Sequence, residues 1–147
     1  MAVRAVIDTN IWVSSLINPY GFPARLRKSF VEGAFTLVAS TPMMEELAEV
    51  LARPRIRNKY LIPDDDVKEL LILLEERAED IMISEEVTIC RDKDDNFIVE
   101  TAIKGKVAYL VTRDDDIKFD KEVLSFLARY GVSVISVAKF LALISKS

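Results

Sequence analysis

The chain has 147 residues, of which 50% are hydrophobic and 30% are charged, and it carries a formal net charge of −4. A chain of this length can bury one ordinary hydrophobic core, so we expect a single domain over residues 1–147. It contains no histidine and one cysteine, which excludes Ser-His-Asp and Cys-His catalysis, histidine-ligated zinc and an internal disulfide. Catalysis would therefore have to use carboxylates, hydroxyls, lysines or metal ions held by oxygen ligands.

Apolar runs and helix-capping residues alternate along the whole chain. In the first half, the pattern predicts a strand at 3–7, a short helix from about 10, a helix that begins at 23 and ends before Gly33, a strand at 35–39 and a helix from 42 to about 53 with Thr41 as its N-cap. In the second half, it predicts a long helix from 64, a strand at 81–83, a helix from about 95 to 104, a strand at 107–111, a helix at 121–130, a strand at 132–135 and a helix at 137–144. Strands separated by helices favour an α/β fold of three layers, with a central parallel sheet of about five strands flanked by helices.

Three acidic residues follow predicted strands or open predicted helices. Asp8 comes directly after the first strand, Asp114 follows the strand that ends near position 111, and Asp95 begins a helix. In an open parallel sheet, the carboxyl ends of the strands and the amino ends of the next helices lie along one edge, where ligands bind. We therefore expect these carboxylates to meet at that edge.

Helix spacing selects Glu46 as a fourth acid. The residues three before and four after it, Met43 and Val50, are apolar, whereas Glu45 shares a face with Glu49. Glu46 is thus expected to point toward the core, where a carboxylate must be paired, protonated or bound to a metal. The same test does not decide between Asp94 and Asp95, because both have apolar residues on their faces.

A set of acids without histidine suits Mg²⁺ or Mn²⁺. These hard cations prefer oxygen ligands, and Mg²⁺ often binds one or two carboxylates together with water and substrate phosphate. Such an ion can activate a water for attack on phosphorus and stabilise the leaving oxygen. It would also give an acidic protein the local positive charge that a nucleic-acid phosphate needs.

A basic segment, RPRIRNKY, follows the Glu46 helix and ends with Tyr60. Its cations are Arg53, Arg55, Arg57 and Lys59. Such a cluster can follow a nucleic-acid backbone while Tyr60 offers a stacking face. A solvated loop between two helices is an equally good interpretation from composition, and the position directly after the Glu46 helix favours substrate contact.

Four fragments in order, VIDTNIWVSSL (6–16), STPMMEELAEVL (40–51), CRDKDDNFIVETA (90–102) and YLVTRDDD (109–116), resemble the PIN-domain family. The likeness extends over most of the chain and is greatest to prokaryotic VapC-like toxins. It implies a metal-dependent endoribonuclease that cleaves single-stranded RNA, the toxin of a toxin-antitoxin pair with a small antitoxin protein as partner. It also implies that Asp8, Glu46, Asp95 and Asp114 are the catalytic, metal-binding acids.

The resemblance assigns further residues around these four acids. Asp116 matches an additional metal-binding position, and Thr9 or Asn10 together with Thr112 would support the acids from behind. Arg113 stands where small residues are common in the family, so it either places a cation beside the scissile phosphate or points to solvent.

Two other functions remain open at this stage. One is an RNA-binding PIN scaffold without turnover; the other is a phosphatase or phosphoaspartyl protein of another doubly wound type. A dehalogenase-like phosphatase needs an Asp at position 10, where this chain has Asn10, and a response-regulator receiver needs an Asp after the third strand, where 81–84 offers none.

The remaining expectations concern location and assembly. The amino terminus, MAVRAVID, lacks the apolar stretch of a signal peptide, and no run approaches about 18 uncharged apolar residues, so we expect a cytoplasmic protein that does not enter a membrane. The apolar run at 70–74 is too wide for one helix face. Either another subunit covers part of it, giving a homodimer or higher homo-oligomer, or the helix is deeply buried.

Overall fold

The computed structural model describes residues 2–145, without the side chains at positions 94, 115 and 116. Within that part of the chain, five strands form one parallel sheet in the order β3-β2-β1-β4-β5. The strands are β1 (Arg4–Ile7), β2 (Thr36–Ala39), β3 (Glu79–Asp80), β4 (Tyr109–Val111) and β5 (Ser133–Ile135). The predicted five-stranded parallel sheet with flanking helices is confirmed.

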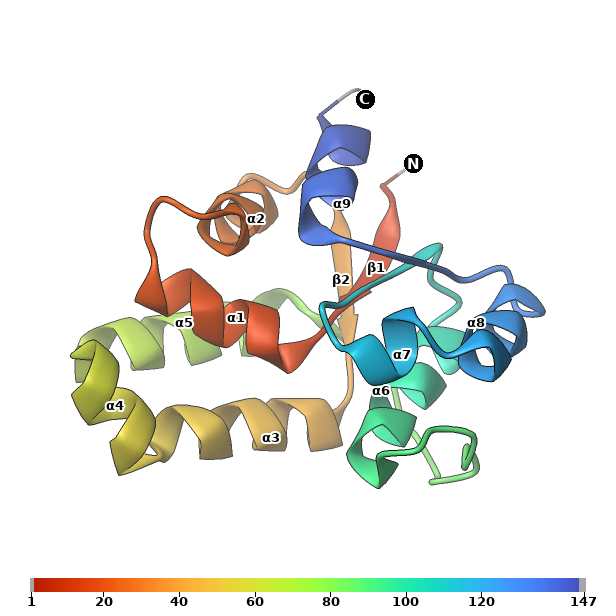
Figure 1. The fold of residues 1–147 in the computed structure, drawn as a ribbon. Helices are drawn as coiled ribbons and strands as arrows, with labels where there is room; N and C mark the ends of the chain where they lie inside the picture. Colours follow the sequence, from red (N-terminus) through yellow and green to blue (C-terminus); the bar gives the residue numbers. More distant parts are fainter. Residues whose placement is uncertain (1, 146–147) are drawn as a thin grey trace.

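Helices connect the strands and lie on both sides of the sheet (Figure 1). They are α1 (Thr9–Ile17), α2 (Phe22–Val31), α3 (Thr41–Ala52), α4 (Pro54–Tyr60), α5 (Asp64–Arg77), α6 (Lys93–Lys104), α7 (Asp115–Lys118), α8 (Lys121–Ala128) and α9 (Val137–Ile144). Within the described range, no helix is both long enough and apolar enough to cross a lipid bilayer.

Two hydrophobic cores cover the two faces of the sheet. Successive residues of a strand point to opposite faces, and in β1 Ala5 and Ile7 belong to one core while Val6 belongs to the other. The first core contains buried residues of α1, α2, α3, α5 and α9, and the second contains residues of α6, α7 and α8. The near-continuous apolar sequence of β1 follows from this double coverage.

The structure differs from the expected elements in four places. The strand predicted at 81–83 lies at Glu79–Asp80, because the edge residues that pair with Val38 and Ala39 are exposed and polar and give no apolar signal. The segment 54–60, for which a solvated loop was one of two interpretations, is helix α4, with Pro54 at its first position. The short helix α7 was not predicted, and α6 begins at Lys93, two residues early.

The apolar run at 70–74 is only partly covered. Leu70 and Leu74 are buried in the first core, Leu71 and Leu73 are half-buried, and Ile72 is 53% exposed. The helix is therefore not buried on all sides in the monomer, and the homo-oligomer stays a prediction.

Candidate active site

Asp8 ends β1 and caps α1, and its side chain is 3% exposed. Its backbone N–H donates to the carbonyl of Val111 at 2.9 Å, which continues the pairing of β1 with β4 by one residue. The Thr112 hydroxyl donates to Asp8 Oδ2 at 2.7 Å and accepts from the backbone N–H of Asp114 at 2.9 Å. One buried hydroxyl thus links the segments that follow β1 and β4, and each segment contains a predicted acid.

Asp95 lies in the first turn of α6 and is 6% exposed. Its carboxyl group is hydrogen-bonded to that of Asp114, and burial, followed by this contact, raises the pKa of Asp95 to about 8. A second carboxyl group so close favours the protonated form of Asp95, because two negative charges repel each other in a buried place. Burial also raises the pKa of Asp8, with Asp114 adding to the shift and the Thr112 hydrogen bond opposing it.

Glu46 faces a cleft of about 780 Å³ that Asp8 and Asp114 also line. The side chain is half-buried, while that of Glu45 is exposed and lines a separate groove between α3 and α5. Helix spacing therefore picked the glutamate that faces the other acids. Three predicted acids line the cleft, and the fourth, Asp95, interacts with one of them, Asp114.

The donor set fits a hard divalent cation. Asp95 Oδ2 is buried and has no hydrogen-bond partner within the described part of the chain, a costly arrangement for a carboxylate oxygen unless a cation binds there. Leaving aside the three undescribed side chains, no three acidic or cysteine side chains of residues 2–145 are close enough to hold an ion by themselves. Mg²⁺ needs no such cage, because it usually keeps several waters and binds one or two carboxylates. The predicted ligand Asp116 lies outside the described side chains.

The two residues after Asp8 lie in different places. Thr9 is buried, and its hydroxyl is 3.5 Å from Asp8 Oδ1, whereas Asn10 is exposed and lines the cleft. Thr9 and Thr112 therefore contact Asp8 directly, and the Asn10 side chain is available to a bound ligand.

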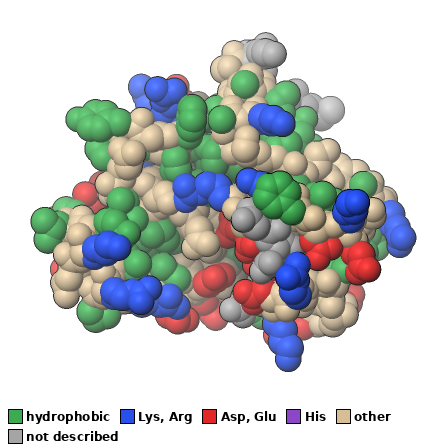
Figure 2. All heavy atoms as spheres, viewed as in Figure 1, with side chains coloured by type: hydrophobic (Ala, Val, Ile, Leu, Met, Phe, Trp, Pro, Cys, Tyr) green, Lys and Arg blue, Asp and Glu red, His purple; other side chains and the backbone are tan. Residues whose placement is uncertain are grey.

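The predicted basic residues separate into two groups. Arg53 and Arg113 line the cleft beside the acids, and Arg55 and Lys59 are exposed on α4, with Lys59 Nζ 5.2 Å from the centre of the Tyr60 ring. Figure 2 shows acidic side chains near the middle of this face with basic side chains on both sides.

The fifth predicted cation, Arg57, is occupied by contacts within the protein. Its guanidinium donates to the carbonyls of Leu51 and Ile62, both at 3.3 Å, and forms an ion pair with Asp64. These contacts close the turn between α4 and α5. Composition cannot separate Arg57 from its neighbours, because the difference arises from where the turn brings those carbonyls.

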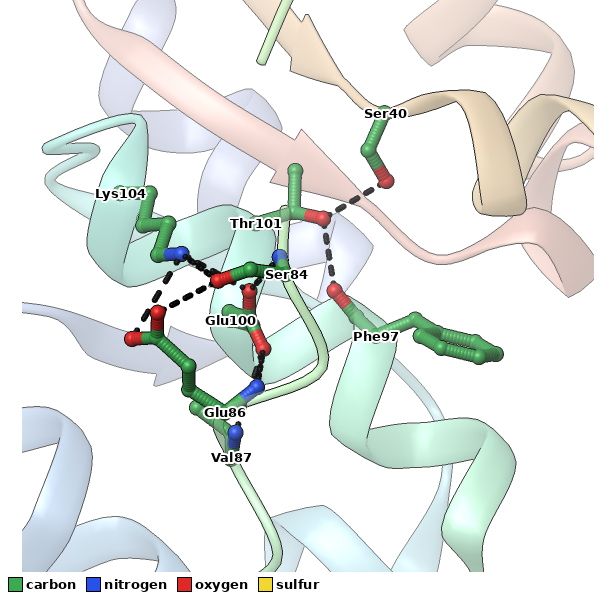
Figure 3. Close-up of polar contacts among 8 residues, drawn as sticks. All are labelled: Ser40, Ser84, Glu86, Val87, Phe97, Glu100, Thr101 and Lys104. Atoms are coloured by element: carbon green, nitrogen blue, oxygen red, sulfur yellow. Dashed lines mark hydrogen bonds and ion pairs between the residues drawn. The ribbon is translucent and has the colours of Figure 1, made fainter. Parts of the chain in front are cut away.

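A buried carboxylate that the sequence did not reveal anchors α6. Glu100 is 1% exposed and accepts from the backbone N–H groups of Ser84, Glu86 and Val87 at 2.7, 2.8 and 3.2 Å (Figure 3). Lys104 Nζ lies 3.1 Å from Glu100 Oε2, the oxygen that accepts from Ser84. Burial raises the pKa of Glu100, but these donors outweigh it and lower the pKa overall.

The neighbouring Thr101 joins α6 to the sheet. Its fully buried hydroxyl lies 2.8 Å from Ser40 Oγ, at the end of β2, and donates to the carbonyl of Phe97 at 2.6 Å (Figure 3). Together with Glu100, it holds the helix that carries Asp95. The contacts with the 84–87 segment and with Ser40 have no local signal in the sequence, because these partners lie 13 to 61 residues away.

Comparison with known proteins identifies the family. Residues 4–116 match the PIN domain family. An uncharacterized protein of Methanocaldococcus jannaschii is 30% identical over 115 residues, which cover 78% of this chain and 73% of that protein. The crystal structure of FitAcB from Neisseria gonorrhoeae has a similar fold, with a TM-score of 0.53 and 18% identity over 90% of this chain and 97% of that chain. The chain belongs to the PIN domain family.

Proposed function

We propose that this PIN-domain protein is a metal-dependent endoribonuclease that cleaves single-stranded RNA with Mg²⁺ or Mn²⁺. The observation that carries the proposal is the buried Oδ2 of Asp95, which has no hydrogen-bond partner among the described residues, while Asp8, Glu46 and Asp114 line one cleft. A divalent cation would satisfy that oxygen.

The roles of the residues follow from their positions. Asp8, Glu46, Asp95 and Asp114 would hold the ion, with Asp116 as a further ligand. When bound, the ion supplies positive charge for the phosphate and lowers the pKa of a coordinated water. Thr112 keeps Asp8 oriented and fixes the backbone of Asp114 through its two hydrogen bonds.

The substrate would bind along the cleft and the exposed face of α4. Arg53 and Arg113 lie at the cleft, and Arg55 and Lys59 extend the basic surface next to Tyr60. Phosphate contacts by such cations supply affinity without sequence specificity, and an aromatic ring can stack on an unpaired base. An unpaired strand exposes those bases, which favours single-stranded RNA.

The biological role proposed is that of a cytoplasmic toxin with a small antitoxin partner. It rests on the resemblance of the four motifs to VapC-like toxins, while the fold shared with FitAcB concerns architecture alone. A homodimer or higher homo-oligomer is proposed from the exposed Ile72 beside half-buried Leu71 and Leu73.

Cleavage of end-labelled RNA tests the activity. Purified protein is incubated with structured and unstructured RNA in Mg²⁺, Mn²⁺ or chelator, beside Asp8→Asn and Asp95→Asn. We expect metal-dependent cutting of the unstructured RNA by the wild type and loss of cutting in both variants. Cleavage that survives the chelator, or both substitutions, contradicts the proposal.

The other functions give different results in the same assay. A scaffold without turnover retains RNA in a binding measurement but cuts nothing under any metal. A phosphatase of another doubly wound type releases phosphate from a phosphomonoester and leaves the phosphodiester chain intact. Adding an unlabelled DNA strand of the same sequence as competitor shows whether the cleft prefers RNA.

A further inference from the structure

Arg113 lies in the chain between Thr112 and Asp114, two residues whose positions are fixed by hydrogen bonds. The Thr112 hydroxyl contacts the carboxylate of Asp8 and the backbone N–H of Asp114, so the peptide on each side of Arg113 is held in place. Its side chain lines the same cleft as Asp8, Glu46 and Asp114. The site therefore contains a permanent cation at a fixed point of its rim.

The guanidinium of Arg113 is held by uncharged groups. Its Nη2 donates to the Ser14 hydroxyl and lies 3.5 Å from the Asn10 carbonyl, both on α1 and about 100 residues away in sequence. Among the described residues, no carboxylate lies within ion-pair distance of it. Arg53, the other arginine of the cleft, lies 3.1 Å from Glu49 and is already compensated.

The contacts of Arg113 use a single nitrogen. A guanidinium carries five N–H donors in a planar fork that matches two oxygens of a phosphate. With Nη2 bound to α1, the donors on Nη1 and Nε remain for a ligand. A side chain attached at one nitrogen keeps its position in the cleft, which reduces the entropy lost when a phosphate binds.

We propose that Arg113 is a catalytic residue that contacts the reacting phosphate and stabilises its charge in the transition state, and that Ser14 positions it. The inference rests on the proposed ribonuclease function. In the hydrolysis, a bond forms between the water oxygen and phosphorus, the bond to the 3′ oxygen breaks, and the water's proton leaves to solvent while the 3′ oxygen gains one. Negative charge grows on the phosphoryl group during this step, and Arg113 neutralises it.

Steady-state kinetics on a single-stranded RNA with Mn²⁺ tests this role. We expect Arg113→Ala to lower kcat on the order of 100-fold, as for loss of one donor to a developing charge, with KM almost unchanged. Added methylguanidinium should restore part of the rate to Arg113→Ala. Arg53→Ala, which removes a compensated cation, should instead raise KM and leave kcat near the wild-type value.

Matched variants separate catalysis from general effects. Arg129→Ala removes an exposed arginine at the end of α8 and should cleave like the wild type. Ser14→Ala should lower kcat about tenfold, as expected for about 1.4 kcal/mol of lost positioning, whereas Ser15→Ala, which loses a hydrogen bond to the Trp12 carbonyl inside the core, should spare kcat.

Two failures are distinguishable. If the wild type cuts RNA with metal but Arg113→Ala keeps the wild-type kcat, whether or not its KM rises, the role of Arg113 is refuted and the ribonuclease function stands. If the wild type cuts no RNA in any metal, the proposed function fails and the inference with it.

Discussion

Replacing Thr112 with Val removes the hydroxyl that bridges two acids of the candidate site and keeps the volume of the side chain. The hydroxyl is fully buried, donates to Asp8 Oδ2 at 2.7 Å and accepts from the Asp114 backbone at 2.9 Å. A hydrogen bond to a charged group contributes roughly 1.5–3 kcal/mol, and the buried partners stay behind without it. We therefore expect the free energy of unfolding to fall by about 2–3 kcal/mol.

The substitution also affects the metal site. The Thr112 hydrogen bond lowers the pKa of Asp8 against the effect of burial, so its loss raises that pKa further and leaves less of the charged form to bind a cation. Partners that orient metal ligands typically contribute about 10- to 100-fold in affinity. Mn²⁺ affinity at pH 7 should fall by a factor in that range, and the decrease should be smaller at higher pH.

Two controls make the result specific. Thr112→Ser keeps the hydroxyl and should keep Mn²⁺ affinity. Ser15→Ala removes a buried hydroxyl that donates to the Trp12 carbonyl inside the core, so it should lose stability but spare the metal. Urea unfolding in chelator measures stability, and calorimetric titration with Mn²⁺ measures affinity. Equal Mn²⁺ affinity in Thr112→Val and the wild type would refute the bridging role.

Three further predictions follow from buried ionisable groups. Because the pKa of Asp95 is raised to about 8, the metal-free folded chain binds more protons than the unfolded chain between about pH 4 and pH 8, so its stability falls as pH rises through that window. Asp95→Asn should flatten this fall in urea unfolding curves with chelator, and an unchanged slope would contradict the raised pKa of Asp95. Glu100→Gln should lower the free energy of unfolding by about 1–3 kcal/mol, because a buried acceptor of three backbone donors loses its charge; hydrogen exchange at Ser84, Glu86 and Val87 that stays as slow as in the wild type would argue against that. Cys90 is buried with a pKa raised to about 12, first by burial, so a thiol reagent at pH 8 should label it only on unfolding; rapid labelling of the native protein would show that the region opens.

The sheet and the site edge could be predicted because their signals are local. Each strand is a short apolar run, each connection has helix caps, and a parallel sheet places Asp8 and Asp114 on one edge whatever the details of packing. The period of α3 was sufficient to separate Glu46 from Glu45. Amino-acid type and spacing carry all of this information.

The parts that could not be predicted depend on contacts between distant segments. Arg53 and Arg57 belong to one short basic segment, yet Arg57 closes a turn and Arg53 lines the cleft. The attachment of Arg113 to Ser14 joins residues 99 apart, and β3 is defined by its pairing with β2 although its own residues are polar. Such features depend on tertiary contacts, which the periodicity of the sequence does not reveal.

The most direct test of the central claim compares two adjacent glutamates of α3. Glu46 faces the cleft with Asp8 and Asp114, and Glu45 faces a separate groove. The measurement is the initial rate of Mn²⁺-dependent cleavage of single-stranded RNA by Glu46→Gln and Glu45→Gln. A carboxylate metal site in the cleft predicts that Glu46→Gln loses most of the activity while Glu45→Gln cuts like the wild type; equal rates in the two variants would contradict it.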